Sequence, residues 1–303
     1  KGGKQPMLTI DHISKSFDGT AALEDVSFSV ENGSICGLVG HNGAGKTTLL
    51  KIAADVLRAD CGQVLLDGSP HLDNEAVRRA VFFLPDDPYS LPQSSFRGTA
   101  AFYAGFFPSW NQLTFDKLTS LFDLDPKKRL LSFSKGMQRQ AFLIIALACQ
   151  PRVLLLDESF DGLDPAKRHL LRQVLLEYIA EKEASVLISS HNLPELENLC
   201  DHVLLLDNHT VAYDRAMDDI QTELRKYRLV FDYPVGEDAF ASLNHRDYSL
   251  SGNIVTITIR DDGEAEAALR ALNPLLLETF PLTLEEVFLY EMEETQHDLT
   301  GLF

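Results

Sequence analysis

A phosphate-binding loop constrains the fold of this chain more than any other feature of its sequence. Residues 40–48 read Gly-His-Asn-Gly-Ala-Gly-Lys-Thr-Thr, which completes the pattern G-x-x-x-x-G-K-T. A short apolar run, residues 35–39, precedes the loop, and residues 48–54 follow it with helical character and no helix breaker. Backbone N–H groups of such a loop wrap an anion, and the helix N-terminus attracts it. The sequence therefore predicts a site for a nucleoside triphosphate.

Two motifs provide the charged groups that a nucleotide requires. We expect Lys46 to contact the β- and γ-phosphates and the Thr47 hydroxyl to ligate Mg²⁺. Residues 153–156 are apolar and end in Asp157 and Glu158. Asp157 is expected to hold Mg²⁺ through water, and Glu158 to polarise the attacking water, work worth about 10²–10⁴-fold in rate. In isolation, an acidic turn after a buried strand is also a common structural feature.

Charge and composition bear on the possible partners. The chain has 27 Lys and Arg residues against 45 Asp and Glu, a formal net charge of −18, with no basic block. Nucleic-acid binders usually carry a basic patch, so we expect no nucleic-acid partner. The longest apolar run, residues 141–149, is far shorter than the ~18 residues that cross a bilayer, so we expect no direct membrane insertion. The four cysteines form no CxxC pair, which is typical of reduced thiols in the cytoplasm.

The first 223 residues have the pattern of an α/β domain. Short alternating strands and the turn pairs Asp-Gly, Asn-Gly and Asp-Gly at residues 18–19, 32–33 and 67–68 predict hairpins. Continuous apolar runs at 153–156, 185–188 and 202–206 predict parallel strands covered on both faces. We expect a domain over residues 7–223: a P-loop NTPase (RecA-like) core with an antiparallel β subdomain.

A helical lobe is expected to interrupt this domain at about residues 92–150. Aromatic residues crowd its first half, between residues 96 and 115. They are interpreted either as the core of the lobe or as a docking groove for a membrane partner. Both interpretations stay open at the level of the sequence.

The last region, residues 224–303, is expected to form a small α+β accessory domain. Strands are predicted at residues 227–233, 247–250, 254–260 and 275–279, and helices at 237–243 and 264–272. The order strand, helix, two strands, helix, strand is ferredoxin-like. An amphipathic helix over residues 284–293 follows.

Three further motifs stand in a fixed order around the loop and the acids. Ser134-Lys135-Gly136-Met137 opens a predicted helix, Gly162-Leu163-Asp164 follows the acids, and His191 follows the next strand. In this order and spacing, the motifs of residues 7–216 closely resemble the ATP-binding subunit of an ABC transporter. The resemblance implies an ATP hydrolase that uses ATP and Mg²⁺.

The resemblance also assigns a role to each matching residue. It implies that Phe17 stacks on adenine, that Glu158 is the catalytic base and that His191 contacts the γ-phosphate. Asp86 stands where the family has a glutamine, and its carboxylate is expected to contact Mg²⁺ or the attacking water. The candidate catalytic residues are Lys46, Glu158 and His191, and the candidate metal ligands are Thr47, Asp86 and Asp157. The candidate nucleotide-binding residues are Phe17, Gly40, His41, Asn42, Gly43, Ala44, Gly45, Lys46, Thr47, Thr48, Asp86, Ser134, Lys135, Gly136, Met137, Asp164 and His191.

Partners and location follow from the same resemblance. In this family two ATPase subunits, identical or different, enclose nucleotide between them, and residues 133–137 of one would complete the phosphate site of the other. The form Ser-Lys-Gly-Met and the run Phe-Pro-Ser-Trp at residues 107–110 resemble bacterial exporters whose integral membrane permease is encoded separately. We therefore expect a cytoplasmic protein at the inner face of the membrane that powers export. The alternative is a soluble ABC ATPase without a permease, acting in translation or DNA maintenance.

Overall fold

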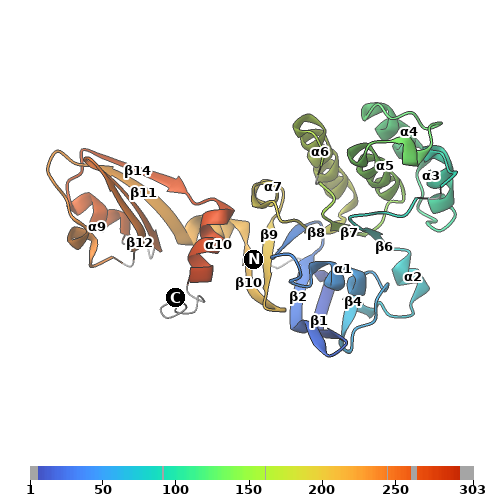
Figure 1. Ribbon diagram of the computed structural model, residues 1–303, viewed down its shortest axis with the longest axis horizontal. Helices are drawn as coiled ribbons and strands as arrows, with labels where there is room; N and C mark the ends of the chain where they lie inside the picture. The colour runs from blue at the N-terminus through green and yellow to red at the C-terminus, as the bar shows by residue number, and fades with distance from the viewer. Residues whose placement is uncertain (1–5, 91, 161, 244, 261–264, 294–303) are drawn as a thin grey trace. The chain divides into compact units, whose positions relative to one another are not determined.

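Within the described residues, three β-sheets organise the chain (Figure 1). The computed structural model describes residues 6–90, 92–160, 162–243, 245–260 and 265–293. It divides the chain into two compact units, residues 1–214 and 215–303. The sequence places a domain boundary at residue 223, whereas this division falls before α8 (Met217–Glu223), which contacts β11 (Leu224–Val230) of the second unit.

The central sheet of the first unit has the strand order β10-β9-β3-β8-β7-β6. β3 pairs in parallel with β8 and β9, and β7 pairs in parallel with β8 and β6. Every residue of β3, β7 and β8 is buried, which explains their continuous apolar runs. The strands are β3 (Ile35–Val39), β6 (Val81–Leu84), β7 (Val153–Asp157), β8 (Ser185–Ser189), β9 (His202–Asp207) and β10 (Thr210–Ala216).

The second sheet of this unit has the order β2-β1-β4-β5, with antiparallel β1–β2, β1–β4 and β4–β5 pairs. Its strands are β1 (Pro6–Phe17), β2 (Thr20–Glu31), β4 (Cys61–Leu66) and β5 (Ser69–Pro70). Residues 18–19 and 67–68 form the predicted hairpin turns. The hairpin predicted at residues 32–33 is wrong, because this turn leads from β2 to β3 in the other sheet, where β3 pairs with parallel strands.

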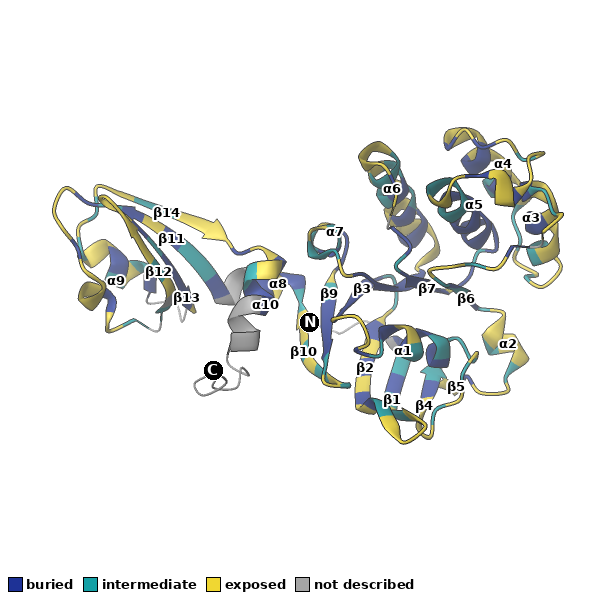
Figure 2. Ribbon diagram, viewed as in Figure 1, coloured by how far each residue is buried: buried dark blue, intermediate teal, exposed yellow. Residues whose placement is uncertain are grey.

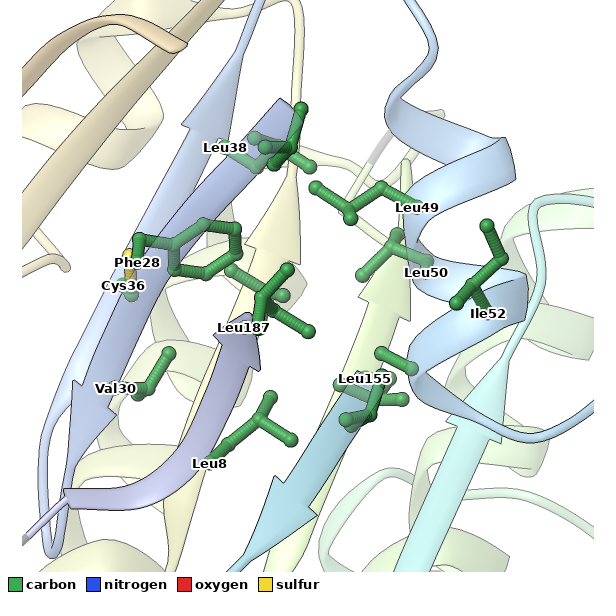
Figure 3. Packing of buried hydrophobic residues seen from close by; sticks show 14 of the residues in the cluster. Leu8, Phe28, Val30, Cys36, Leu38, Leu49, Leu50, Ile52, Leu155 and Leu187 are labelled. Atoms are coloured by element: carbon green, nitrogen blue, oxygen red, sulfur yellow. The ribbon is translucent and has the colours of Figure 1, made fainter. Parts of the chain in front are cut away.

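A helix of the phosphate-binding loop, α1 (Lys46–Ala53), packs between the two sheets (Figure 3). Its inner face contributes Leu49, Leu50 and Ile52 to a core that also contains side chains of both sheets. Among the strands around this core, β3 and β7 are buried along their whole length, whereas β2 alternates buried and exposed residues (Figure 2). Burying one such aliphatic side chain stabilises the fold by about 1.5–3 kcal/mol. The sheet side chains labelled in Figure 3 are Leu8, Phe28, Val30, Cys36, Leu38, Leu155 and Leu187.

The helical lobe consists of α3, α4, the 3₁₀ turn η1 and α5. A serine or asparagine side chain caps each α-helix and accepts a hydrogen bond from its first turn. Phe96 and Phe115 are buried with ring centroids 5.0 Å apart, whereas Phe102 and Phe106 are exposed. No helix in the described part of the chain is long and apolar enough to cross a membrane. The helices of this unit are α1, α2 (Glu75–Arg78), α3 (Phe96–Ala104), α4 (Gln112–Leu121), η1 (Leu130–Ser132), α5 (Lys135–Ala148), α6 (Pro165–Lys182) and α7 (Leu193–Glu197).

The second unit is built on an antiparallel sheet of order β12-β13-β11-β14, the ferredoxin-like arrangement. Its elements are β11, η2 (Glu237–Phe240), β12 (His245–Ser251), β13 (Ile254–Arg260), α9 (Ala265–Ala271), β14 (Leu276–Pro281) and α10 (Leu284–Glu293). The helix predicted over residues 237–243 is only the 3₁₀ turn η2. One residue of this turn, Phe240, is buried, so no apolar stripe holds a longer helix in place.

Candidate active site

The phosphate-binding loop turns from β3 into α1 with its glycines held against two neighbouring strands. Gly43 and Gly45 have φ angles of 89° and 105°, which favour glycine. A Cβ on Gly45 would lie 2.4 Å from the carbonyl oxygen of Ala22 in β2, and a Cβ on Gly40 would lie 2.4 Å from that of Leu206 in β9. The backbone of β2 and β9 therefore sets the shape of the loop.

Lys46 holds its ammonium group at the head of this loop. The residue is only 6% exposed, and Nζ donates hydrogen bonds to the carbonyl oxygens of Gly40 (2.6 Å) and His41 (3.2 Å). Nζ also lies 3.9 Å from Oε1 of Glu158. His41 is exposed, and its Nδ1 lies 2.8 Å from the carbonyl oxygen of Asn42. The cation thus lies between the loop and the acidic strand end.

Asp157 is buried at the end of β7 with a hydroxyl donor on each carboxylate oxygen. Thr47 Oγ1 donates to Oδ2 (2.8 Å) and Ser189 Oγ donates to Oδ1 (2.6 Å). These bonds offset the cost of burying a carboxylate. Carboxylate and hydroxyl oxygens are the ligands that Mg²⁺ prefers, so the residues present fit this ion. Ser189 was not among the candidate residues; the signal that could have identified it is a polar residue ending a buried strand next to β7.

Glu158 and His191 meet at the same edge of the sheet. Glu158 Oε2 lies 2.7 Å from Nδ1 of His191, and an ionised carboxylate can only accept, so Nδ1 donates. The backbone N–H of Glu158 donates to two atoms of Ser189, Oγ (N···O 3.1 Å) and the carbonyl oxygen (N···O 3.2 Å). Glu158 adopts a left-handed φ of 49°, a strained conformation that is frequent in functional sites. The strand end therefore aims this carboxylate at both Lys46 and His191.

The segment at residues 134–137 lies at the N-terminus of α5. Ser134 is exposed, and its Oγ accepts a hydrogen bond from the N–H of Met137 (3.3 Å). A Cβ on Gly136 would lie 2.9 Å from the carbonyl oxygen of Gly162, so these two loops of one chain are in contact. Asp164 caps α6 by accepting from the N–H of Lys167 (3.0 Å).

Asp86 has a partner that its sequence position did not suggest. Its carboxylate accepts a hydrogen bond from the Arg139 guanidinium of α5 and forms an ion pair with it. The Asp86 side chain is 54% exposed and that of Arg139 is 18% exposed. Arg139 was not a candidate residue, although it is the cation nearest the start of α5 after Lys135. The expected contact of Asp86 with Mg²⁺ stays a prediction.

Phe17 ends β1 with its side chain 46% exposed, and the ammonium of Lys15 lies 5.5 Å from the ring centroid. The β1–β2 hairpin that carries Phe17 also carries Ala22, the neighbour of Gly45. Direct contacts join the following candidate residues: Gly40, His41, Asn42, Ala44, Lys46, Thr47, Asp157, Glu158 and His191. Of the other candidates, Gly43, Gly45 and Thr48 belong to the same loop and helix, and residues 134–137 lie at the start of α5. The contacts described for Phe17, Asp86 and Asp164 are with other residues, namely Lys15, Arg139 and Lys167.

Comparison with known proteins gives consistent likenesses. A family model described as ABC transporter matches residues 23–161. The chain is 29% identical over 284 residues to the Bacillus subtilis ABC transporter ATP-binding protein YtrB, covering 93% of this chain and 97% of that protein. It is 30% identical over 247 residues to the uncharacterized ABC transporter ATP-binding protein YxlF of the same bacterium, covering 80% of this chain and 81% of that protein. The Nod factor export ATP-binding protein I of Rhizobium johnstonii is 29% identical over 288 residues, covering 91% and 92% of the two chains.

Solved structures share the fold. The ATP-binding subunit of an ABC transporter superposes with a TM-score of 0.66 at 28% identity, over 71% of this chain and 92% of that one. A dimeric ATP-binding cassette described as a post-hydrolysis state bound to ADP and Pi superposes with a TM-score of 0.63 at 18% identity. That match covers 70% of this chain and 99% of the other, and at this identity it bears on the fold alone.

Proposed function

The chain belongs to the ATP-binding proteins of ABC transporters, and we propose that two ATPase subunits of this kind form a dimer that drives export through a separate membrane permease. ATP binding and hydrolysis are the activity of the family. The observation that carries the proposal is the convergence of Lys46, Glu158 and His191 on one point next to the phosphate-binding loop.

In this proposal each of the three residues acts on a different part of the reaction. Lys46 offsets the negative charge of the β- and γ-phosphates. Water attacks the γ-phosphorus, the bond to the bridging oxygen breaks, and Glu158 accepts the proton of the water. His191 donates through Nδ1 to Glu158, which orients the carboxylate (2.7 Å). The products are ADP and inorganic phosphate.

Asp157 and Thr47 would hold Mg²⁺, which when bound neutralises charge on the transferred phosphoryl group. Ser189 has the supporting role of fixing Oδ1 of Asp157, and β8 delivers it because this strand lies between β3 and β7. Phe17, on the hairpin beside the loop, would contact the adenine ring.

A second subunit would complete the phosphate site. Ser134 and Lys135 are exposed at the N-terminus of α5, where helix N–H groups attract an anion. Gly136 lies against Gly162, so the segment at residues 134–137 and the loop after β7 form one continuous surface. This arrangement supports a role for Ser134 and Gly136 toward the nucleotide of the partner rather than that of their own subunit.

An exposed aromatic patch on α3 and the segment after it, Phe102 and Phe106, supports docking to a membrane permease. The two residues are 50% and 58% exposed with ring centroids 5.0 Å apart. Exposed apolar clusters of this kind are typical of interaction sites. Export is favoured by the likeness to the Nod factor export ATP-binding protein I. The chain would then lie at the inner face of the membrane, held there by its permease, and a role as a soluble ABC ATPase is not favoured.

Coexpression with each membrane protein found to be encoded next to this chain tests the proposal. The two proteins should copurify, and the permease in lipid vesicles should raise the rate of ATP hydrolysis. Replacing Phe102 and Phe106 together by Ala should abolish copurification and leave the basal ATPase rate unchanged. Leu113→Ala, at a 61% exposed position on α4, is the matched control and should copurify normally. If the rate of ATP hydrolysis is the same with and without each of these membrane proteins, and none copurifies, the transport role is refuted.

A further inference from the structure

A pocket of about 340 Å³ lies between α6 and α7, outside the group of residues proposed to act on ATP. Its apolar walls include Phe160 and Leu199, and its polar lining includes Arg168, Arg172 and Asn192. A volume of this size falls in the range of about 300–1,000 Å³ that is usual for small-ligand sites. Apolar walls with a few polar groups are the usual composition of such a site.

The pocket lining contains two arginines, Arg168 and Arg172, and a single carboxylate, Glu195, so one positive charge is not neutralised. Arg168 pairs with Glu195 (2.9 Å), whose Oε1 also receives a hydrogen bond from the side chain of Asn192 (3.0 Å). In the part of the chain that the structure describes, the buried Nε atoms of Arg168 and Arg172 have no hydrogen-bond partner. A buried donor of this kind normally has a partner. The lining therefore carries two N–H donors without an acceptor and one excess positive charge, in a chain whose net charge is −18.

We propose that this pocket binds a small organic anion, a carboxylate or a phosphate ester, with an apolar body. Arg168 and Arg172 are four residues apart on α6, so their side chains lie on the same face of the helix. Guanidinium groups bind carboxylate and phosphate oxygens through paired N–H donors. The anion accepts hydrogen bonds from the two Nε atoms, and its apolar body contacts Phe160 and Leu199.

The pocket is lined by residues from the segments that follow β7 and β8, the two strands that end next to the candidate active site. Phe160 lies two residues after Glu158, and Pro165 directly follows Asp164. Asn192 follows His191, and its N–H donates to Oγ of Ser190 (2.9 Å). A bound anion holds these two segments together. The pocket is therefore an effector site for the ATPase, while the binding itself does not depend on the proposed transport function.

Three small probes that share a phenyl ring distinguish the possible ligand chemistries. Benzoate carries a carboxylate, phenyl phosphate a phosphate ester and benzyl alcohol no charge. Binding to the full chain is measured by calorimetry with saturating Mg-ADP, so that the phosphate-binding loop is already filled. We expect at least one anion to bind, and benzyl alcohol to bind at least tenfold more weakly than that anion. Binding of benzoate alone assigns a carboxylate, and binding of phenyl phosphate alone assigns a phosphate ester. The proposal is overturned if neither anion binds, or if benzyl alcohol binds equally well.

Arg172→Gln removes the excess charge and should weaken anion binding about ten- to a hundredfold, the usual value of a charged hydrogen bond. Arg79→Gln, which removes the same charge from an exposed position on the same unit, should leave binding unchanged. His169→Glu adds a negative charge at an exposed residue of the lining and should weaken binding without loss of folding. Circular dichroism and the ATPase rate report whether each variant is folded. Anion binding that is equally tight in wild type, Arg172→Gln and His169→Glu would place the anion elsewhere.

Discussion

The carboxylate of Asp86, just after β6, accepts a hydrogen bond from the guanidinium of Arg139 in the second turn of α5. This contact connects the edge of the central sheet to α5, the helix that Ser134 caps. If α5 moves relative to β6, either this ion pair breaks or the two side chains move together. The pair therefore couples the lobe to the core.

Asp86→Asn should disturb this coupling more than nucleotide binding. Because the Asp86 side chain is 54% exposed, the pair is worth at most about 1 kcal/mol of folding free energy, and the melting temperature should hardly change. We expect ATP affinity, measured with a fluorescent analogue, to change less than tenfold, which is about 1.4 kcal/mol. The ATPase rate with permease should fall. The charge swap of Asp86→Arg with Arg139→Asp should restore part of it, and no restoration would argue against the ion pair.

Glu158→Gln should separate binding from hydrolysis. Glutamine keeps the size of the side chain but cannot accept the proton of water, so turnover should fall about 10²–10⁴-fold while ATP still binds. Lys46→Ala should instead lose ATP affinity, because the ammonium next to the loop is removed. Single-turnover hydrolysis and equilibrium binding measure the two effects. Near wild-type turnover in Glu158→Gln would make the assignment of the base wrong.

Ser189→Ala should raise the Mg²⁺ concentration needed for half-maximal hydrolysis. The change leaves Oδ1 of Asp157 without its 2.6 Å donor and costs about 1–3 kcal/mol of stability. Ser185→Ala in the same strand is the control, since Ser185 is equally buried but donates to the carbonyl oxygen of Glu31 (2.7 Å). It should lower stability and leave the Mg²⁺ requirement unchanged. Equal Mg²⁺ requirements in the two variants would contradict the role of Ser189.

Acidification should destabilise the first unit through His71. Burial lowers the pKa of His71, so below about pH 6.5 the unfolded chain binds a proton that the folded chain does not. The free energy of unfolding therefore decreases as the pH decreases. His71→Leu should flatten the fall of the urea midpoint between pH 7.5 and 5.5. His12→Gln should steepen it, because the hydrogen bond with Asp25 raises the pKa of His12 and favours the folded state at low pH. Identical pH slopes in wild type and His71→Leu would refute this account.

Residues 1–214 should hydrolyse ATP without the second unit. Every contact described for the candidate active site lies between residues 15 and 206, within this unit. A stop after Asp214 keeps the contact of its carboxylate with His202 and removes α8 together with β11. We expect Mg²⁺-dependent hydrolysis, with a higher protein concentration needed for half-maximal rate. A truncated chain that is folded by circular dichroism, binds ATP and dimerises but hydrolyses nothing would show that the second unit takes part in the chemistry.

Local patterns predicted the elements that carry the site. Two such patterns are the glycine loop between an apolar strand and a helix, and the apolar strand that ends in Asp157 and Glu158. Each pattern is formed by a few consecutive residues, so it can be recognised in the sequence. The order of strands along the second unit was predicted from local patterns in the same way. The turn at residues 32–33 shows where this reasoning fails, because an Asn-Gly turn does not specify which sheet receives the next strand.

The partners of the site residues depend on contacts that are distant in sequence. Ser189 reaches Asp157 only because β8 is inserted between β3 and β7, a consequence of sheet order. Arg139 reaches Asp86 because α5 packs near the end of β6. Neither pairing has a local signal, since each joins residues more than 30 positions apart.

The two hydroxyl donors on Asp157 have a consequence for the speed of the reaction cycle. Thr47 and Ser189 immobilise both oxygens of the carboxylate when the chain folds, so its loss of rotational freedom belongs to folding. Such a loss would otherwise oppose each new binding event. An enzyme that releases and reloads its nucleotide would meet this entropic barrier in every turnover. Here the acceptor keeps its orientation from one turnover to the next, so reloading needs no search among rotamers.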